Sequence, residues 1–293
     1  MGTLRVERIA AMMPNTKKNA SRLTVHLVCL LIGIVSLYPL VWMVASSLKE
    51  SSQVFVSAHS LIPASWDFGS YISGWRGFAG ITFGTFFKNT VIIVCSVVAG
   101  TLVSCSLIAY GFARIPFRLK GFWFATVMLT LLLPGQIVQI PQYIIFYKMG
   151  WVNTFLPLIV PAFFGSAFFI FLLLQFIRTI PYELDEAAKI DGCSRFGIFS
   201  RVILPLIKPA LVTAAIFEFY WAWDNFFGAL IYLGRPQLYT LSVALRLFAD
   251  PSSGTDWSAM FAMATLSLIP PILVFFIFQR YIVEGISTTG LKG

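Results

Sequence analysis

Polar and aromatic side chains alternate in one apolar segment, Glu218-Phe219-Tyr220-Trp221-Ala222-Trp223-Asp224-Asn225. In a helix, Glu218, Trp221 and Asn225 share one face, while Tyr220 and Asp224 share a neighbouring face. Aromatic rings pack against the C–H faces of sugars, and carboxylate and amide groups bind sugar hydroxyls. These residues, together with Trp223, are therefore candidates for lining a carbohydrate pathway. The alternatives are that the rings anchor the chain at a membrane interface and that Asp224 pairs with a basic residue of another chain.

Two glutamines in another apolar run are weaker candidates for the same pathway. Gln136 and Gln139 share a helix face and lie between Pro134 and Pro141. Proline frees backbone carbonyls, which must then be satisfied by protein or by a water-filled cavity. The two glutamines either line such a cavity or join helices through side-chain hydrogen bonds.

Other chemistries are excluded by missing motifs. A phosphate-binding loop needs G-x-x-x-x-G-K-[S/T], and the chain contains no Gly-Lys dipeptide, no dinucleotide fingerprint and no G-x-S-x-G elbow. The four cysteines show no C-x-x-C spacing, and the two histidines are not placed at the spacing of metal ligands. The sequence predicts no catalytic site, no metal site and no bound cofactor in this chain.

The composition is that of an integral membrane protein. Of 293 residues, 58% are hydrophobic and only 11% are charged, and the mean hydropathy is +0.84, whereas soluble domains carry about 25% charged residues. The net charge of +9 does not indicate nucleic-acid binding, because the basic residues sit in loops between apolar runs. A cation excess in such loops is what membrane orientation requires.

Six apolar runs have the length of about 20 residues that a transmembrane helix needs. No pattern of alternating polarity persists along a strand's length, which excludes a barrel. The first run is longer than the roughly 7–15 residues of a signal-peptide core, so we expect it to be retained. The fold class is therefore an all-α membrane protein, with an N-terminal segment 1–22, a transmembrane domain 23–283 and a tail 284–293. The six predicted spans are Leu23–Ser46, Phe86–Ala113, Phe122–Tyr147, Thr154–Ile177, Leu206–Leu233 and Met260–Tyr281.

The basic residues predict the orientation of these spans. With the N-terminus in the cytoplasm, 15 of the 21 Lys and Arg residues lie on the cytoplasmic side. This asymmetry places both termini in the cytoplasm. It also places there the polar segment between the fourth and fifth spans.

That segment, 178–208, has four carboxylates and five basic residues, too many charges for hydrocarbon. Its residues predict a helix–turn–helix. Pro181 suits a first helical turn, and Gly192 ends the first helix. Ser194 caps the second helix, and Pro205 opens the fifth span. The first helix begins with the acidic residues Glu183, Asp185 and Glu186, which favour the positive end of the helix dipole. An ordinary loop that tethers two spans is the alternative.

The motifs of this segment resemble the EAA loop of ABC importer permeases, with boundaries at 178–205. Motifs elsewhere in the chain narrow the resemblance to the maltose-type carbohydrate permeases, which have the type I importer fold. The matching residues of the loop are Glu186, Ala187, Ala188, Asp191, Gly192, Phe199, Ile203, Leu204 and Pro205. The other matches are Ser36-Leu37-Tyr38-Pro39, Tyr110-Gly111-Phe112-Ala113-Arg114, Leu133-Pro134-Gly135 and Phe278-Gln279-Arg280-Tyr281.

The resemblance implies that the loop is a coupling helix, which docks in a cleft of an ATP-hydrolysing subunit. Glu186, Ala187 and Gly192 would then be the contact residues, with Ala187 and Ala188 permitting close approach. Cys193 stands where the family more often has Ala. The order Trp223-Asp224-Asn225 inverts the family's usual Trp-Asn-Asp/Glu, which weakens the transfer of individual sugar contacts.

The resemblance also implies partners. These are a second permease subunit, two ATP-binding subunits that hold ATP and Mg²⁺, an extracytoplasmic solute-binding protein and the lipid bilayer of a bacterial inner membrane. The expected cargo is a carbohydrate, either a neutral oligosaccharide or an acidic one of the alginate- or pectin-derived kind. The outer loop 49–85 either covers the pathway, touches the binding protein or lies at the interface. The alternative function is secondary transport driven by an ion gradient, although no inverted repeat is visible.

Overall fold

The computed structural model describes residues 15–63, 65–249 and 256–290, and the side chains of 23–63, 65–249 and 256–281. Within these ranges every regular element is a helix, and the one β-type contact is an isolated bridge between Phe78 and Ile81. The predicted all-α class is therefore confirmed. Most of the predicted N-terminal segment, 1–14, and the last three residues of the predicted tail lie outside the described residues.

The α-helices are α2 (Asn15–Ser46), α3 (Gly69–Arg76), α4 (Phe83–Arg114), α5 (Lys120–Thr130), α6 (Gly135–Lys148), α7 (Leu156–Ile159), α8 (Ala167–Thr179), α9 (Glu183–Ile190), α10 (Arg195–Ile198), α11 (Leu204–Leu206), α12 (Lys208–Trp223), α13 (Phe226–Tyr232), α14 (Leu241–Phe248) and α15 (Trp257–Gly290). Three short 3₁₀ helices, η1 (Ser51–Gln53), η2 (Val160–Phe164) and η4 (Pro236–Leu238), and one π-helical turn, η3 (Phe199–Ile203), complete the structure.

Among the described residues, four helical segments are long and apolar enough to cross a membrane, and the number is six if each of two bent helix pairs counts as one span. This agrees with the six predicted spans. The four are Leu23–Ser46, Phe83–Arg114, Leu156–Thr179 and Trp257–Tyr281, and the bent pairs are Lys120–Thr130 with Gly135–Lys148 and Arg195–Leu206 with Lys208–Trp223.

The third predicted span is not the single helix 122–147 that its hydropathy indicated. Helices α5 and α6 meet at an angle of 98°. Pro134 causes the break, because it has no N–H to donate and disfavours helical backbone in the residue before it. Its own ψ of 127° takes the chain out of the helix before α6 begins at Gly135.

The fifth predicted span, 206–233, is interrupted at two places. Helix α12 is bent by 76° from the segment Arg195–Leu206, so Pro205 lies in that preceding segment and does not open the span. Pro209 does so instead, in the first turn of α12, where its missing N–H costs nothing. The second break separates α12 from α13, where the Asn225 side chain accepts a hydrogen bond from the Gly228 N–H and caps α13.

The fourth span is broken where η2 passes into α8. Gly165 has φ +93° there, a backbone conformation that other residues rarely adopt. The break leaves backbone groups without helical partners, and α4 satisfies them. The Ser104 hydroxyl donates to the carbonyl of Ala162 (2.8 Å), and the Ser166 N–H donates to the sulfur of Cys105 (3.2 Å). Irregular backbone inside a membrane is tolerated only with such partners.

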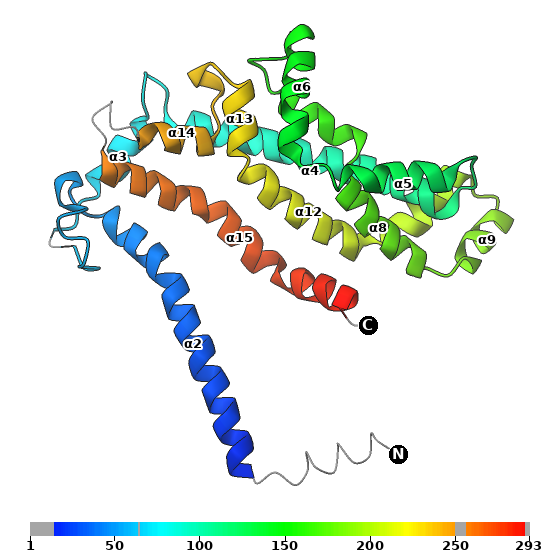
Figure 1. Ribbon diagram of the computed structural model, residues 1–293, viewed down its shortest axis with the longest axis horizontal. Helices are drawn as coiled ribbons and strands as arrows, with labels where there is room; N and C mark the ends of the chain where they lie inside the picture. Colours follow the sequence, from blue (N-terminus) through cyan, green and yellow to red (C-terminus); the bar gives the residue numbers. More distant parts are fainter. Residues whose placement is uncertain (1–14, 64, 250–255, 291–293) are drawn as a thin grey trace.

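Helix α4 is the centre of the bundle and packs against α8, η2 and α12. Helix α15 packs along α12 and reaches α3 and α14 (Figure 1). Helix α2 diverges from the other helices, and none of the 18 residues that define its span is buried. It is attached at its C-terminal end, where the rings of Trp42 and Phe261 meet edge to face at 5.2 Å.

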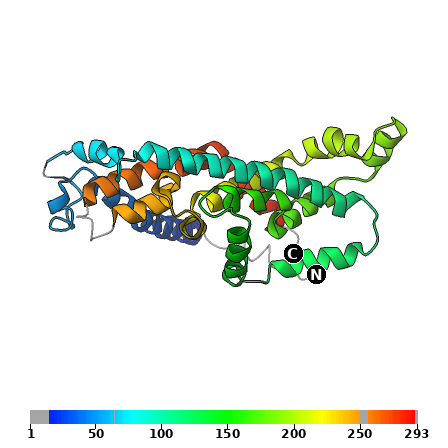
Figure 2. The same cartoon turned by 90° about the horizontal axis from the view of Figure 1, so that it is seen from above.

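The two ends of the bundle carry different elements. Helix α9 lies at one end of the long axis, and α3 and α14 lie at the other (Figures 1 and 2). The segment after α2 folds around Lys49, whose ammonium donates to the carbonyls of Ser57 (2.8 Å) and Ser60 (2.7 Å). The Ser258 hydroxyl at the start of α15 also donates to the Lys49 carbonyl.

Candidate functional site

A cavity of about 530 Å³ opens where the fourth and fifth spans are interrupted. Volumes of roughly 300–1,000 Å³ are typical of small-molecule sites. Glu218, Trp221 and Asn225 all line it, so the structure brings together the three residues that the sequence placed on one helix face. The rest of the wall is supplied by Ile93, Val97, Thr101, Thr130, Leu131, Leu158, Pro161, Ala162, Gly165, Ser166, Ala167 and Ala222.

Trp221 gives this cavity an aromatic wall. Its ring packs against Phe168 (centroids 5.1 Å apart) and Phe169 (5.2 Å) of α8. Nevertheless, 52% of Trp221 remains exposed. The indole is thus fixed by one set of contacts while much of its surface is left available to a ligand.

Glu218 is the only ionisable residue among those that line the cavity. Thr101 of α4 and Ser166 add two hydroxyl groups to the same wall. Thr101 and Ser166 are site residues that the sequence analysis missed. Thr101 and Ser104 are polar residues three apart in a largely apolar run, which is the pattern that would have indicated a polar helix face.

The other candidate pathway residues lie elsewhere. Tyr220 donates from its hydroxyl to the Pro271 carbonyl of α15 (2.9 Å), and Trp223 stacks on Phe219 (5.4 Å). Asp224 is exposed at the break after α12. Gln136 and Gln139 lie on α6, beyond the bend of the third span, and neither lines the cavity. No group of described His, Cys, Asp and Glu residues is arranged to hold a metal ion.

A second candidate site is the helix pair after α8. The first helix, α9, has three acidic residues in its first turn, as expected, and it ends at Ile190, shortly before Gly192, whose φ is +80°. At this end, the Gly192 N–H donates a hydrogen bond to the carbonyl of Lys189 (3.0 Å), and the Cys193 N–H donates to the carbonyl of Ala188 (2.9 Å). The predicted glycine stop is confirmed, and only a residue that tolerates positive φ fits here.

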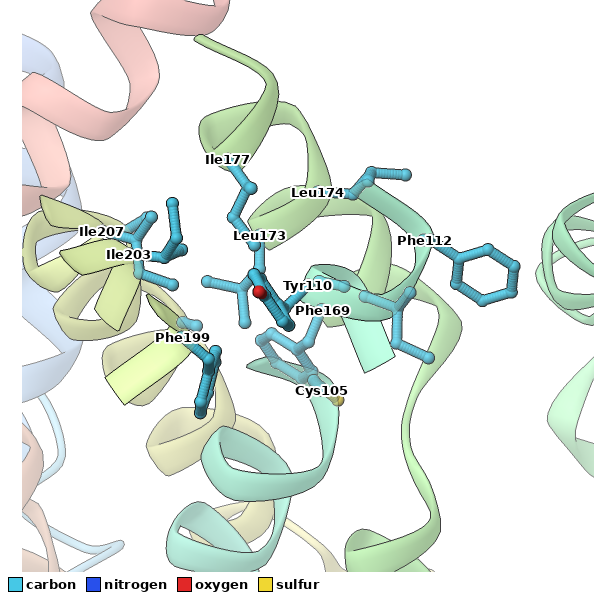
Figure 3. Close-up of a cluster of buried hydrophobic side chains, with 14 of the residues drawn as sticks. Cys105, Tyr110, Phe112, Phe169, Leu173, Leu174, Ile177, Phe199, Ile203 and Ile207 are labelled. Atoms are coloured by element: carbon cyan, nitrogen blue, oxygen red, sulfur yellow. The ribbon is translucent and has the colours of Figure 1, made fainter. Parts of the chain in front are cut away.

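The second helix of the pair begins at Ser194, and its side chain accepts a hydrogen bond from the Gly197 N–H (3.1 Å). This confirms the predicted cap. The helix continues through the π-helical turn of η3 into α11. Its buried side chains, Ile198, Phe199 and Ile203, join the main hydrophobic cluster with residues of α4 and α8. Figure 3 shows this cluster gathered around Tyr110 and Leu173.

The exposed side of the pair carries most of the predicted docking residues. Glu186, Ala187, Asp191, Gly192 and Pro205 are exposed, and Leu204 is half-buried. Ala188 is different, because only 8% of it is exposed and it packs against the protein's own cluster. The close approach expected at Ala188 is therefore an approach within this chain.

Large apolar side chains accompany these residues on the surface. Ile190 is 87% exposed and Phe196 is 69% exposed, beside the charged groups of Lys189 and Asp191. Exposed apolar groups rimmed by polar residues are typical of protein-binding surfaces.

Asp185 is a further residue whose role the sequence did not reveal. It was expected to act only on the helix dipole, but it is 2% exposed and faces Arg114 at the end of α4. The spacing of Asp185 and Ala188, three residues apart, would have indicated that both lie on one face of α9.

Comparisons with known proteins agree with this architecture. Residues 103–288 match the family described as binding-protein-dependent transport system inner membrane component. The probable ABC transporter permease protein YurM of Bacillus subtilis is 37% identical over 257 residues, which are 87% of this chain and 84% of that protein. The arabinooligosaccharides transport system permease protein AraQ of Halalkalibacterium halodurans is 30% identical over 264 residues, 89% and 93% of the two chains.

A solved structure shares the fold. It is the crystal structure of a bacterial ABC transporter involved in the import of the acidic polysaccharide alginate, with a TM-score of 0.81 and 21% identity over 92% of this chain and 99% of that chain. The overall fold of this chain thus has a solved counterpart. With more than half of its length matched, the chain belongs to the family of binding-protein-dependent transport system inner membrane components, the permease subunits of ABC transporters.

Proposed function

We propose that this permease forms half of the membrane pathway of an ATP-driven carbohydrate importer, and that its cargo is a neutral oligosaccharide. The observation that carries the proposal is the cavity wall, which combines the Trp221 ring with the hydroxyl, amide and carboxyl groups of Thr101, Asn225 and Glu218. Such a set suits the C–H faces and hydroxyls of a sugar. The permease whose name specifies arabinooligosaccharides is 30% identical.

The charge of the wall favours a neutral cargo over a uronate. Glu218 is its single ionisable group, and no Lys or Arg is among the residues that line it. Like charges brought together away from water repel strongly. The alginate importer bears on the fold alone at 21% identity, so its acidic cargo does not count against this inference.

The proposed entry point for ATP hydrolysis is the exposed side of α9. Glu186 can accept a hydrogen bond or ion pair from a partner, and Ala187 permits close approach. Ile190 supplies apolar area that burial against a partner would stabilise by about 25 cal/mol per Å². The partners proposed here are two subunits that bind ATP and Mg²⁺.

Two further partners, a second permease subunit and a solute-binding protein, are proposed from the exposed surfaces of this chain and from its family. The 18 residues that define the span of the apolar helix α2 are all unburied, which suits contact with lipid and with a second permease subunit. The family is defined by dependence on a binding protein, and we place that protein at the end of the bundle that carries α3 and α14. This arrangement requires both chain termini on the side of α9, the cytoplasm, in a bacterial inner membrane.

Reconstitution separates this proposal from secondary transport. Proteoliposomes containing this chain, a second permease, the ATPase subunits and the sugar-loaded binding protein are expected to accumulate sugar only with ATP. Ion gradients without ATP should give no accumulation. Uptake by this chain under an ion gradient alone would contradict the proposal and establish the secondary-transport alternative.

Two variants test the cargo assignment. Trp221→Leu is expected to lower neutral-oligosaccharide uptake about ten-fold, because loss of the ring removes contact worth about 1.4 kcal/mol. Trp223→Leu is the matched control, since Trp223 packs against Phe87 and Phe219 outside the cavity. The measurement is the initial rate of uptake at fixed ATP. Equal losses in both variants would place the sugar elsewhere.

Glu218→Gln removes the one ionisable group of the cavity wall while keeping its shape. We expect the wild-type complex to take up a neutral oligosaccharide at least about ten-fold faster than a uronate of equal length, and the variant to narrow that ratio. Competition uptake with the two sugars measures it. An unchanged ratio would show that Glu218 does not set the charge preference.

A further inference from the structure

Arg114 and Asp185 join the end of α4 to the first turn of α9. The Arg114 Nε and the Asp185 Oδ2 are 3.4 Å apart, and the two side chains are only 8% and 3% exposed. The Arg114 Nη2 also donates to the Ile180 carbonyl (2.6 Å), and its guanidinium lies over the ring of Tyr182, 5.3 Å from the centroid. One arginine therefore holds the segment that leads into α9 at three points.

The same end of α4 also holds the second helix of the pair. Tyr110, one turn before Arg114, donates from its hydroxyl to the Arg195 carbonyl (2.9 Å), and its ring packs against Phe199 (5.2 Å). Both helices of the pair are thus attached to α4 through polar contacts from Tyr110 and Arg114. A displacement of the pair must either move α4 or break these contacts.

The ion pair is incompletely satisfied in this conformation. Neither the Asp185 Oδ1 nor the Arg114 Nε, both buried, has a hydrogen-bond partner among the described residues. Buried polar atoms are nearly always paired, and a buried charge is costly unless its remaining hydrogen-bonding capacity is filled. Because this capacity is unfilled, the ion pair is sensitive to small displacements of either helix, and it ties the position of α9 to that of α4.

Helix α4 connects this contact to the cavity. Its residues Ile93, Val97 and Thr101 line the cavity wall, and its last residue is Arg114. We propose that Arg114 and Asp185 form the joint through which displacement of α9 is transmitted to α4 and so to the cavity. This proposal rests on the proposed docking of an ATPase subunit at α9, and it assigns positioning roles to two residues that do not themselves face that partner.

The test compares variants of the pair in the complete reconstituted importer. Asp185→Asn removes the buried charge, the double variant Arg114→Gln with Asp185→Asn removes both charges, and Arg114→Glu with Asp185→Arg inverts the pair. Glu183→Gln is the control, because it removes an exposed carboxylate from the same helical turn. Three quantities are measured: co-purification of the ATPase subunits, ATP hydrolysis without sugar, and the stimulation of hydrolysis by the sugar-loaded binding protein.

The expected result is a loss of coupling with assembly retained. Asp185→Asn and the double variant should lower the stimulation ratio about ten-fold, while co-purification and unstimulated hydrolysis stay at the level of Glu183→Gln. The inverted pair should recover part of the ratio, which loss of an ordinary structural contact would not predict.

Two other outcomes would contradict the proposal that Arg114 and Asp185 transmit motion from α9 to α4. A double variant that assembles with a normal stimulation ratio would show that the pair does not transmit motion. Failure of every pair variant to co-purify the ATPase subunits would show that it only stabilises the fold. Neither result bears on the proposal that an ATPase subunit docks at α9. That proposal is contradicted separately if charge reversal at Glu186 leaves uptake unchanged.

Discussion

Glu186→Lys is expected to reduce ATP-driven sugar uptake about a hundred-fold, because it reverses the charge at the proposed contact with the ATPase subunit. Glu186 is exposed in the first turn of α9. The structure shows no hydrogen bond or ion pair from its side chain to another described residue. The wild-type carboxylate therefore contributes little to the fold beyond its favourable position at the helix N-terminus, worth about 0.3–1 kcal/mol.

The measurement is uptake and ATP hydrolysis by proteoliposomes, with co-purification of the ATPase subunits as the readout of docking. Glu50→Lys is the matched control: the same change of charge at an exposed position on the other side of the first span. The control should keep assembly and uptake. Normal uptake in Glu186→Lys would mean that the ATPase subunit binds elsewhere.

Features that depend on a few neighbouring residues could be predicted from the sequence. Gly192 ends α9 because it tolerates positive φ, and Ser194 caps the next helix with its own hydroxyl. Both are local effects. Helical spacing also predicts that Glu218, Trp221 and Asn225 lie near one another. They do so in the structure because α12 continues as far as Trp223, two residues before Asn225.

Features that depend on distant contacts could not be predicted in this way. Pro134 indicated a disturbance of the third span, but the residue alone does not predict the 98° angle between α5 and α6. The burial of Asp185 depends on Arg114, which lies in a different helix. At the break in the fourth span, the Ala162 carbonyl is satisfied by Ser104, which lies in a different helix. In each case a tertiary partner decides what a polar residue does.

Phe199→Ala is expected to destabilise the permease by about 3–5 kcal/mol, the usual range for removing a buried phenylalanine ring. Phe199 is 5% exposed and lies in the main hydrophobic cluster, where its ring packs against Tyr110 at 5.2 Å. Phe199 is the first residue of the π-helical turn η3, and this turn packs the second helix of the pair against α4 and α8 (Figure 3). The cavity left by the ring would weaken the packing of the second helix against α4 and α8.

The neighbouring phenylalanine supplies the control for this prediction. Phe196 lies one turn earlier in the same helix and is 69% exposed, so Phe196→Ala should change the free energy of unfolding by no more than about 0.5 kcal/mol. Thermal unfolding of the purified chain in detergent compares the two. Because Phe199 anchors the helix that also receives the Tyr110 hydrogen bond, its loss should uncouple hydrolysis from sugar as well. Equal stability of the two variants would mean that Phe199 does not hold the helix pair against the bundle. The connection from α9 to α4 would then depend on the contacts of Arg114 and Tyr110.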